Sequence, residues 1–365
     1  MLWLMEQIAP LGGAPAWTGD DLRADESGWR RPLSANHIAE IEAALRHARA
    51  AGVPWHQMTR ADFPLDKLGA ELEAVSEELE NGRGIIQLKG VPVAGKSPDE
   101  NKTMFMGLSS WLGTPVYQSA KGEILGEIRD EGPDVGLKRG QMTNPDGTAF
   151  LSSRSRAQST QPLRWHTDRT DIVGLLCVGA PAEGGASRLS SAVTIHDAMV
   201  RRRPDLAALL YEPIFRSRLG EEADGVESIY GLPVFTVKDG KFASHYSRTY
   251  VEAAQKLATT PQMSDAQWEA LDMLAALGDE FCYEMYLDPG DMQFLNNHVV
   301  YHARAAFRDD PAAGKVRNLY RVWLAARNGR DLPACFAELF GDTAGGHLRG
   351  GILQAEDRSV RSPFA

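Results

Sequence analysis

The stretch "DIVGLLCVG", residues 171–179, decides the fold because it has the length and apolar character of a short buried strand. Several similar runs follow it, and two long helical inserts interrupt them. Separated short strands with helical excursions favour a β-sandwich or jelly roll over a doubly wound sheet, in which strands and helices alternate regularly. We therefore expect a mostly β, α+β fold with a jelly-roll core and helical decoration. The further runs are 187–195, 233–237, 242–246, 291–297 and 316–325.

The first 115 residues are predicted to form helices around one strand. Residues 66–82 carry an apolar residue on every turn and end at a glycine, and "GIIQLKGVPV" at 84–93 indicates a strand. Ser97 and Glu100 form a capping box for the next helix. We expect one domain over residues 1–365, with a helical region at 1–82, a jelly-roll core at 83–327 and a C-terminal extension at 328–365.

Composition excludes several classes of protein. The chain has 365 residues, of which 43% are hydrophobic and 24% charged, as in an ordinary globular protein. Its net charge of −10 argues against a nucleic-acid surface. No run is long enough to span a membrane, and the N-terminal "MLWLMEQIAP" lacks the features of a signal peptide. Three distant cysteines indicate no disulfide framework, so we expect a cytoplasmic protein.

Candidate metal ligands lie in two distant segments. The stretch "RWHTDRT", residues 164–170, contains His166 and Asp168, which alone would fit an ordinary polar turn. The segment "GDMQFLNNHVVYHARAAF", residues 290–307, contributes His298 and His302. If this segment is extended, both histidines lie on one side, so strand periodicity does not choose between them. Both histidines therefore stay candidate ligands at this point, and the one that binds no metal is expected to be structural.

The stretch "RNLYRVWLA", residues 317–325, places Arg317 and Arg321 on the same strand face as apolar residues. Guanidinium groups are costly to bury without an anionic partner. Two histidines and one carboxylate leave three coordination positions open, which is the arrangement of non-haem Fe(II) sites. A 2-oxo acid and O₂ can fill these positions. Arg317 would then hold the distal carboxylate of 2-oxoglutarate.

These segments together resemble the taurine dioxygenase/2,4-dichlorophenoxyacetate dioxygenase (TauD/TfdA) family, to which clavaminate synthase is related. The resemblance rests on "WHTD" at 165–168, "GGASRLSS" at 184–191, 290–307 and "RNLYRVWL" at 317–324. It implies a double-stranded β-helix. It also implies that His166, Asp168 and His302 bind Fe(II), that Arg317 and Ser187 bind 2-oxoglutarate, and that Arg321 contacts the co-substrate or an anionic group of the substrate. Because the interval between His302 and Arg317 is slightly long, Arg321 stays an alternative anchor.

Two further groups are candidates for substrate contact. Tyr117 and Gln118 begin a segment that builds one wall of the substrate pocket in related enzymes. Four arginines crowd the approach to the proposed iron ligands, where they would attract an anionic substrate or simply be solvated. These arginines are Arg154, Arg156, Arg164 and Arg169.

The sequence thus predicts an Fe(II)- and 2-oxoglutarate-dependent dioxygenase that consumes O₂ and releases succinate and CO₂. We expect hydroxylation of an unactivated C–H bond in a small, anionic or amino-acid-like molecule, with desaturation and ring closure left open. Asp168 argues against halogenation, because related halogenases have Gly or Ala at that position. The alternatives are a zinc-dependent hydrolase, for which a HExxH helix is lacking, and a non-catalytic jelly-roll binding protein. Both a monomer and a homo-oligomer stay open.

Overall fold

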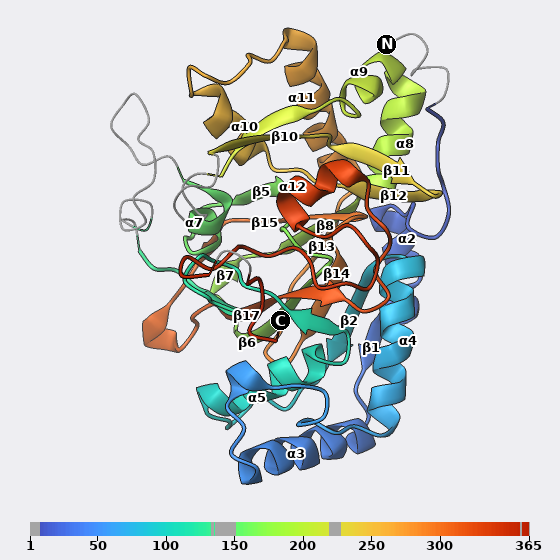
Figure 1. The fold of residues 1–365 in the computed structure, drawn as a ribbon. Helices are drawn as coiled ribbons and strands as arrows, with labels where there is room; N and C mark the ends of the chain where they lie inside the picture. Colours follow the sequence, from blue (N-terminus) through green and yellow to red (C-terminus); the bar gives the residue numbers. More distant parts are fainter. Residues whose placement is uncertain (1–7, 133–134, 136–150, 219–227, 358–359, 365) are drawn as a thin grey trace.

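Two β-sheets form the centre of the molecule in the computed structural model, which describes residues 8–132, 135, 151–218, 228–357 and 360–364 (Figure 1). The larger sheet has the strand order β1-β2-β14-β6-β17-β3, with β4 also paired to β17, and the smaller has the order β13-β8-β15-β5. The strands of the larger sheet are β1 (Arg30–Pro32), β2 (Ile85–Lys89), β3 (Gly113–Pro115), β4 (Leu125–Ile128), β6 (Ile172–Gly179), β14 (Met292–Asn296) and β17 (Asn318–Ala326). Those of the smaller sheet are β5 (Leu163–His166), β8 (Ser187–Ser191), β13 (Tyr283–Met285) and β15 (Val300–Arg304).

The two sheets share a hydrophobic core, which confirms the predicted jelly roll. Val173 and Trp323 from the larger sheet belong to the same buried cluster as Leu189 and Tyr301 from the smaller one. Burial of such side chains stabilises the fold by roughly 1.5–3 kcal/mol each. The pairing is antiparallel throughout both sheets, except that β1 runs parallel to β2.

Helices cover the outer face of each sheet (Figure 1). Near the larger sheet lie α3 (Ala35–Ala50), α4 (Lys67–Asn81) and α5 (Pro98–Ser109), whereas α2 (Gly19–Ala24) contacts β13 of the smaller sheet. Near the smaller sheet lie α7 (Ser153–Ala157), α8 (Ala192–Arg202), α9 (Pro204–Leu209), α10 (Arg248–Gln255) and α11 (Asp265–Glu280). The capping box predicted at Ser97 and Glu100 is present at the start of α5, where it satisfies backbone N–H groups that the helix leaves free.

Three further pairs of short strands lie outside the two central sheets. β9 (Ile214–Ser217) pairs with β10 (Ile229–Leu232), and β16 (Phe307–Arg308) pairs with β7 (Glu183–Gly184). The hairpin of β11 (Phe235–Lys238) and β12 (Lys241–Ser244) turns at Asp239 and Gly240. Both turn residues have positive φ, 50° and 75°, as a tight two-residue hairpin turn requires.

One predicted strand is shorter than expected. The run 187–195 was expected to be a single strand, but β8 ends at Ser191 and α8 begins at Ala192. The reason is local: the side chain of Ser191 accepts a hydrogen bond from the backbone N–H of Thr194 and thereby caps the helix. The first helical insert therefore starts inside the apolar run that resembles a strand.

The C-terminal segment crosses the molecule next to the strands of the larger sheet. It carries α12 (Ala337–Phe340), and its later part is pinned by backbone hydrogen bonds from Gly351 to the carbonyl of Arg169 and from Ile352 to that of Tyr117. The expected division of the chain into a helical region, a core and a C-terminal extension at residues 82 and 327 stays a prediction.

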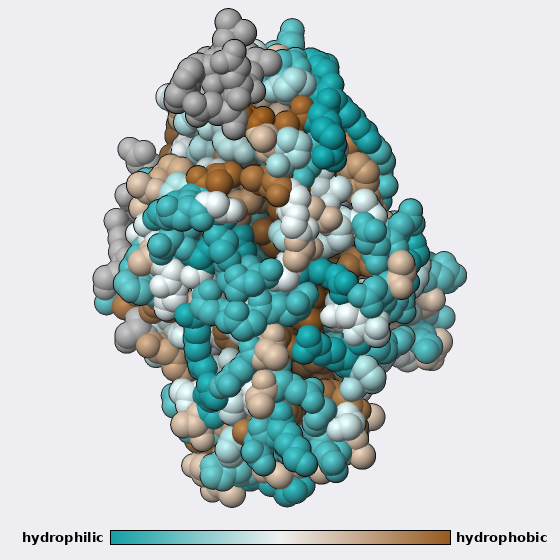
Figure 2. Space-filling view, turned by 90° about the vertical axis from the view of Figure 1, so that its right-hand side faces the viewer, coloured by the Kyte–Doolittle hydropathy of each residue, from teal (hydrophilic) through white to brown (hydrophobic). Residues whose placement is uncertain are grey.

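The surface is mainly polar. Figure 2 shows hydrophilic residues over most of the face turned to the viewer, with apolar residues in separate patches. Among the described residues, no helix combines the length and apolar character needed to cross a membrane. Residues 1–7 of the apolar N-terminal stretch lie outside the described part. The large exposed apolar side chains, Leu11, Val237, Tyr286 and Val316, come from distant segments.

Candidate metal centre and its cavities

Two neighbouring strands of the smaller sheet bring His166 and His302 together. β5 and β15 are antiparallel, and His166 is the register partner of His302. The two imidazole rings lie 4.1 Å apart between centroids. Asp168 follows two residues after His166, where its backbone N–H donates to the side-chain oxygen of Asn297. Residues 136 positions apart in the sequence thus become direct neighbours because strands pair.

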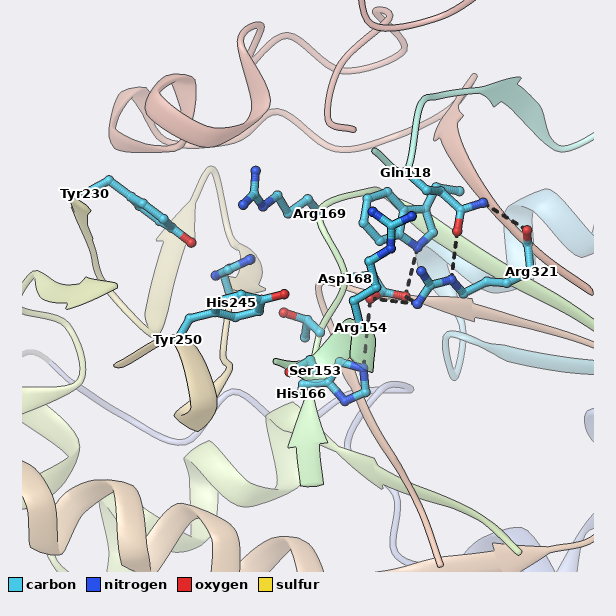
Figure 3. A pocket seen from close by; sticks show the side chains of 12 residues that line it. Gln118, Ser153, Arg154, His166, Asp168, Arg169, Tyr230, His245, Tyr250 and Arg321 are labelled. Carbon is cyan, nitrogen blue, oxygen red and sulfur yellow. Dashed lines mark hydrogen bonds and ion pairs between the residues drawn. The ribbon is translucent and has the colours of Figure 1, made fainter. Parts of the chain in front are cut away.

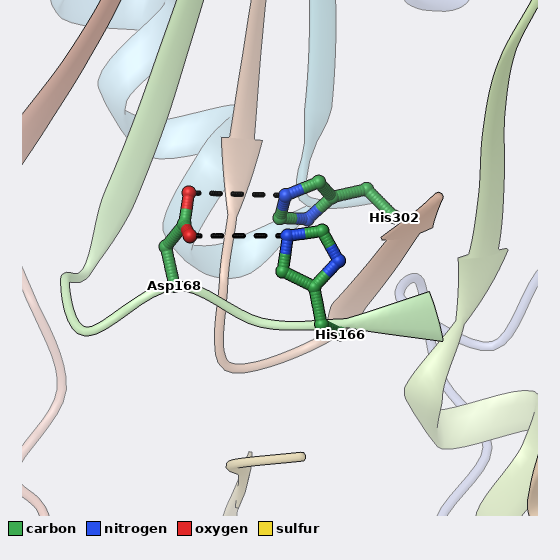
Figure 4. Close-up of side chains that lie close together, drawn as sticks. All are labelled: His166, Asp168 and His302. Carbon is green, nitrogen blue, oxygen red and sulfur yellow. Dashed lines mark ion pairs between the residues drawn. The ribbon is translucent and has the colours of Figure 1, made fainter. Parts of the chain in front are cut away.

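The three side chains converge on one point (Figure 4). Nε2 of His166 lies 3.9 Å from Oδ1 of Asp168, and Nε2 of His302 lies 3.8 Å from Oδ2. One ligand atom from each residue lies within 4.8 Å of the others. These separations exceed hydrogen-bonding distance but suit atoms that share an ion at about 2 Å each. Two imidazoles and a carboxylate are a donor set that fits Fe(II).

The charges of the three residues at neutral pH also suit a cation. Burial lowers the pKa of His166, and burial together with His166 lowers the pKa of His302 to about 3, so both rings are neutral. Burial alone would raise the pKa of Asp168. The positive charge of Arg321 and the hydrogen bond from Trp323 favour the carboxylate and bring its pKa below its usual value. The site therefore presents two free nitrogen lone pairs and one negative charge.

Neighbouring groups fix the orientation of these side chains. Nδ1 of His166 lies 2.9 Å from the backbone carbonyl of Arg164, which selects the tautomer with a free Nε2. The indole N–H of Trp323 donates to Oδ2 of Asp168 at 2.9 Å. Arg321 lies 3.4 Å from the same oxygen, and its Nε donates to the side-chain oxygen of Gln118 at 2.8 Å.

A cavity between the two sheets adjoins the metal-binding cluster; we call it the inner cavity. It combines the predicted residues Ser187, Arg317 and Arg321 with His166 and His302. Its middle is apolar. The full lining is Ile128, Ala157, Leu163, His166, Val173, Leu175, Ser187, Leu189, Gln293, His302, Ala303, Arg304, Arg317 and Arg321.

Arg317 projects into the inner cavity from the residue before β17. Its side chain is 5% exposed, and its guanidinium makes one long hydrogen bond, 3.5 Å to the carbonyl of Ile128. Burial lowers its pKa to about 10, so it stays charged at neutral pH. No carboxylate pairs with it in the described part of the chain. A buried cation without a countercharge is costly, which indicates a place for an anion.

The glycine pair before β8 allows Ser187 to reach this cavity. Gly184 and Gly185 both have positive φ, 71° and 75°, which other residues rarely adopt. A Cβ atom on Gly184 would lie 2.3 Å from the carbonyl oxygen of Ala306, so a side chain there cannot fit without displacement. The glycines therefore let β8 approach the segment that follows β15.

A second cavity, the outer cavity, also borders the cluster (Figure 3). Figure 3 shows Gln118 and Arg321 on one side of Asp168 and the side chains of Tyr230, His245 and Tyr250 on the other. Among the described residues, only His166 and Arg321 line both cavities. The full lining is Gln118, Ser153, Arg154, His166, Thr167, Asp168, Arg169, Tyr230, His245, Tyr250, Arg321 and Trp323.

The polar groups of the outer cavity are largely fixed. Arg154 pairs with Glu123, and the hydroxyl of Ser153 lies 3.2 Å from that of Ser247. Burial, followed by the charges of Arg216 and Arg169, lowers the pKa of His245 well below its usual value, so its ring is neutral. The outer cavity therefore offers both charged and neutral hydrogen-bonding groups.

Several candidates from the sequence lie elsewhere. Tyr117 packs into the core cluster under the larger sheet and lines neither cavity. Arg164 forms an ion pair with Glu252 of α10 and lines neither cavity. Nε2 of His298 lies 2.8 Å from Oδ1 of Asp171, and His298 does not belong to the cluster. A turn at Asn297 separates β14 from β15, so the segment is not continuously extended, and this break places only His302 at the cluster.

Sequence reasoning missed much of the outer cavity. Tyr230, His245 and Tyr250 come from separate segments that only the tertiary structure brings together. His245 carried the one available signal, since a histidine in an otherwise apolar strand run requires a polar partner. Arg304 was likewise not singled out, although it lines the inner cavity two residues after His302.

Comparison with known proteins agrees with this geometry. A sequence profile described as "Taurine catabolism dioxygenase TauD, TfdA family" matches residues 48–323. The chain is 28% identical to FR-33289 synthase from Streptomyces rubellomurinus over 89% of this chain and 93% of the relative. It is also 28% identical to the taurine hydroxylase-like protein SAT17 from Stachybotrys chartarum, over 84% of this chain and 77% of that protein.

Solved structures share the fold. An asparagine oxygenase in complex with Fe(II), 3-hydroxyasparagine and succinate is similar with a TM-score of 0.60 at 17% identity, covering 81% of this chain and 93% of that chain. The non-haem iron oxygenase OrfP in complex with Fe and α-ketoglutaric acid is similar with a TM-score of 0.58 at 17% identity, covering 87% and 99%.

Proposed function

The chain belongs to the taurine catabolism dioxygenase TauD, TfdA family and is a 2-oxoglutarate-dependent non-haem iron dioxygenase; from this premise we propose which residues carry the reaction. We propose that His166, Asp168 and His302 hold Fe(II) and that the inner cavity holds 2-oxoglutarate. The supporting observation is that one cavity joins the His-Asp-His cluster to a buried arginine without a countercharge.

The iron and its co-substrates supply the oxidising chemistry, in which 2-oxoglutarate and O₂ are consumed and a C–H bond of the substrate is hydroxylated. The protein's residues bind the iron and 2-oxoglutarate and orient them. Arg317 and the hydroxyl of Ser187 bind the distal carboxylate of 2-oxoglutarate, and the apolar middle of the inner cavity accepts its methylene groups. Arg317 is a better anchor than Arg321, because Arg321 is already held by Gln118 and Asp168.

We propose that the outer cavity binds a small, anionic or amino-acid-like substrate. Arg154, Arg169 and Arg321 give this cavity a positive lining. Relatives of the same fold include an asparagine oxygenase and OrfP, which has been solved with (3S)-hydroxy-L-Arg. Gln118 supports the substrate side indirectly by holding Arg321. The unpaired cysteines support a reducing compartment, and we propose the cytoplasm.

The two alternatives lack a supporting observation. A zinc hydrolase would leave the arginines of the inner cavity without a role. A binding protein without catalysis would leave the oriented His-Asp-His cluster without a role. Family membership agrees with neither.

A two-part experiment tests the proposal. Fe(II) and 2-oxoglutarate are added to the protein without oxygen, and the visible charge-transfer band of the iron complex is recorded; small amino acids and anions are then screened for succinate release above the background without substrate. We expect a band in the native protein and its loss in Asp168→Ala. A native protein without the band, or a variant with unchanged metal content, would contradict the proposal.

A further inference from the structure

Arg304 is a second buried cation in the inner cavity and has no role in the function proposed above. It lies at the end of β15, and its side chain is 4% exposed. It lines the inner cavity together with Arg317 and Ser187.

The hydrogen bonds of Arg304 leave its charge without a counterion. Its guanidinium donates to four backbone carbonyls, and its Nε is buried without a partner. It forms no ion pair with any residue that the structure describes. Carbonyl dipoles solvate the guanidinium but carry no net charge, so the positive charge is retained in a dry environment. The acceptors are the carbonyls of Arg156, Ala157, Ser159 and Gln161.

Arg304 also lies close to Arg317 through a shared aromatic ring. The guanidinium carbon of Arg304 is 4.7 Å from the ring centroid of Phe307, and that of Arg317 is 5.2 Å from the same centroid. Both guanidinium groups contact the same ring, so the two buried like charges lie within about 10 Å of each other and repel. A negatively charged ligand would remove this repulsion, whereas a neutral ligand group would leave it in place.

The lining of the inner cavity indicates where that negative charge would lie. It combines His166 and His302 of the metal-binding cluster with apolar side chains such as Val173 and Leu189. A ligand that spans the cavity therefore has a chelating group at one end, methylene groups in the middle and a carboxylate near Arg317 and Ser187.

We propose that Arg304 is a specificity-determining residue of the co-substrate pocket: its charge reinforces Arg317 and selects dicarboxylic over monocarboxylic 2-oxo acids. This inference rests on the proposed binding of 2-oxoglutarate in the inner cavity. Arg304 would then have two roles: it holds the segment before β5 through hydrogen bonds to backbone carbonyls, and it contributes to the choice of co-substrate.

The test compares the affinity for 2-oxoglutarate with that for the monocarboxylic 2-oxobutyrate. Each is titrated without oxygen into the full chain loaded with Fe(II), and Kd is obtained from the charge-transfer band. In Arg304→Gln, which removes the charge, the preference for 2-oxoglutarate should fall about tenfold or more. In Arg304→Lys, which keeps the charge but loses carbonyl contacts, the preference should stay within about threefold of native.

Arg361→Gln is the matched control. Arg361 also donates to three backbone carbonyls, those of Leu339, Gly350 and Gly351, but it lines neither cavity. Its replacement should lower the melting temperature without changing the preference between the two acids.

The outcomes separate the two proposals. If native protein gives no band with 2-oxoglutarate, the proposed function fails. If native protein gives the band and a folded Arg304→Gln keeps the full preference, Arg304 only anchors the chain and the inference is wrong. Should the glutamine variant not fold, Arg304→Met, which also removes the charge, takes its place: a loss of preference supports the inference, and a retained preference in the folded protein overturns it.

Discussion

Trp323 donates its indole N–H to Oδ2 of Asp168 at 2.9 Å, the same oxygen that faces Nε2 of His302. Both Trp323 and Asp168 are buried, so this bond is protected from water. It holds the carboxylate in the orientation that meets both imidazoles. The larger sheet thus contributes to the metal centre through a side chain that is not itself a metal ligand.

Removing this hydrogen bond should weaken metal binding. Since groups that orient a metal ligand contribute roughly 10- to 100-fold in affinity, Trp323→Phe should raise the Kd for Fe(II) by about that factor. Competition with a metal-binding dye measures it. Trp111→Phe is the control, because the Trp111 indole donates to the carbonyl of Phe63 far from the cluster. Equal losses in both variants would show a general effect of instability.

The two neighbouring histidines should behave differently. His302→Ala should lose Fe(II), because it removes one of three ligands. His298→Ala should keep the iron but unfold at a lower temperature, because it leaves the buried Asp171 without one of its partners. The iron-to-protein ratio and the melting temperature of each variant are measured together. Loss of iron from a folded His298→Ala protein would reverse the assignment.

Arg317 should dominate binding of 2-oxoglutarate. A charge-assisted hydrogen bond contributes roughly 1.5–3 kcal/mol, so Arg317→Met should raise the Kd for 2-oxoglutarate by about a hundredfold if two such bonds are lost. Iron binding should change little, since Arg317 does not contact the cluster. Titrations with 2-oxoglutarate and with Fe(II), each followed by the charge-transfer band, give the two affinities. If Arg321→Met has the larger effect on 2-oxoglutarate, Arg321 is the main anchor.

His298 should also make stability depend on pH. Burial lowers its pKa from 6.5, although Asp171 opposes this effect, so the folded protein favours the neutral ring. The unfolded chain takes up a proton below about pH 6.5, and the stability that the neutral ring provides is lost as pH falls below that value. We expect the urea midpoint to decrease between pH 7.5 and 5.5, and to decrease less in His298→Gln. An identical pH dependence in the two proteins would contradict this.

The sequence predicts best where local rules act. The capping box at Ser97 marks the start of α5 as expected, because Ser97 and Glu100 satisfy each other's backbone groups. The strand expected to continue to residue 195 ends at Ser191 for a similar reason, since the Ser191 hydroxyl caps the helix that begins at the next residue.

The metal-binding cluster could be expected from residue types and order, but its surroundings could not. The roles of Trp323 and Gln118 depend on strand register across sheets, which a single sequence does not fix. Arg304 was overlooked because its neighbours in the sequence are alanines, while its neighbours in space are Phe307 and Arg317.

The separation of the two cavities has a consequence for how such an enzyme diversifies. The inner cavity is built largely on strands of the two central sheets, and most of these strands are paired on both sides, so they resist change. Ser153, Tyr230 and Tyr250 of the outer cavity sit on a short helix, an edge strand and a peripheral helix. Mutations there can reshape which molecule is oxidised while leaving the oxidising apparatus intact, so new substrates are accessible by few amino-acid changes.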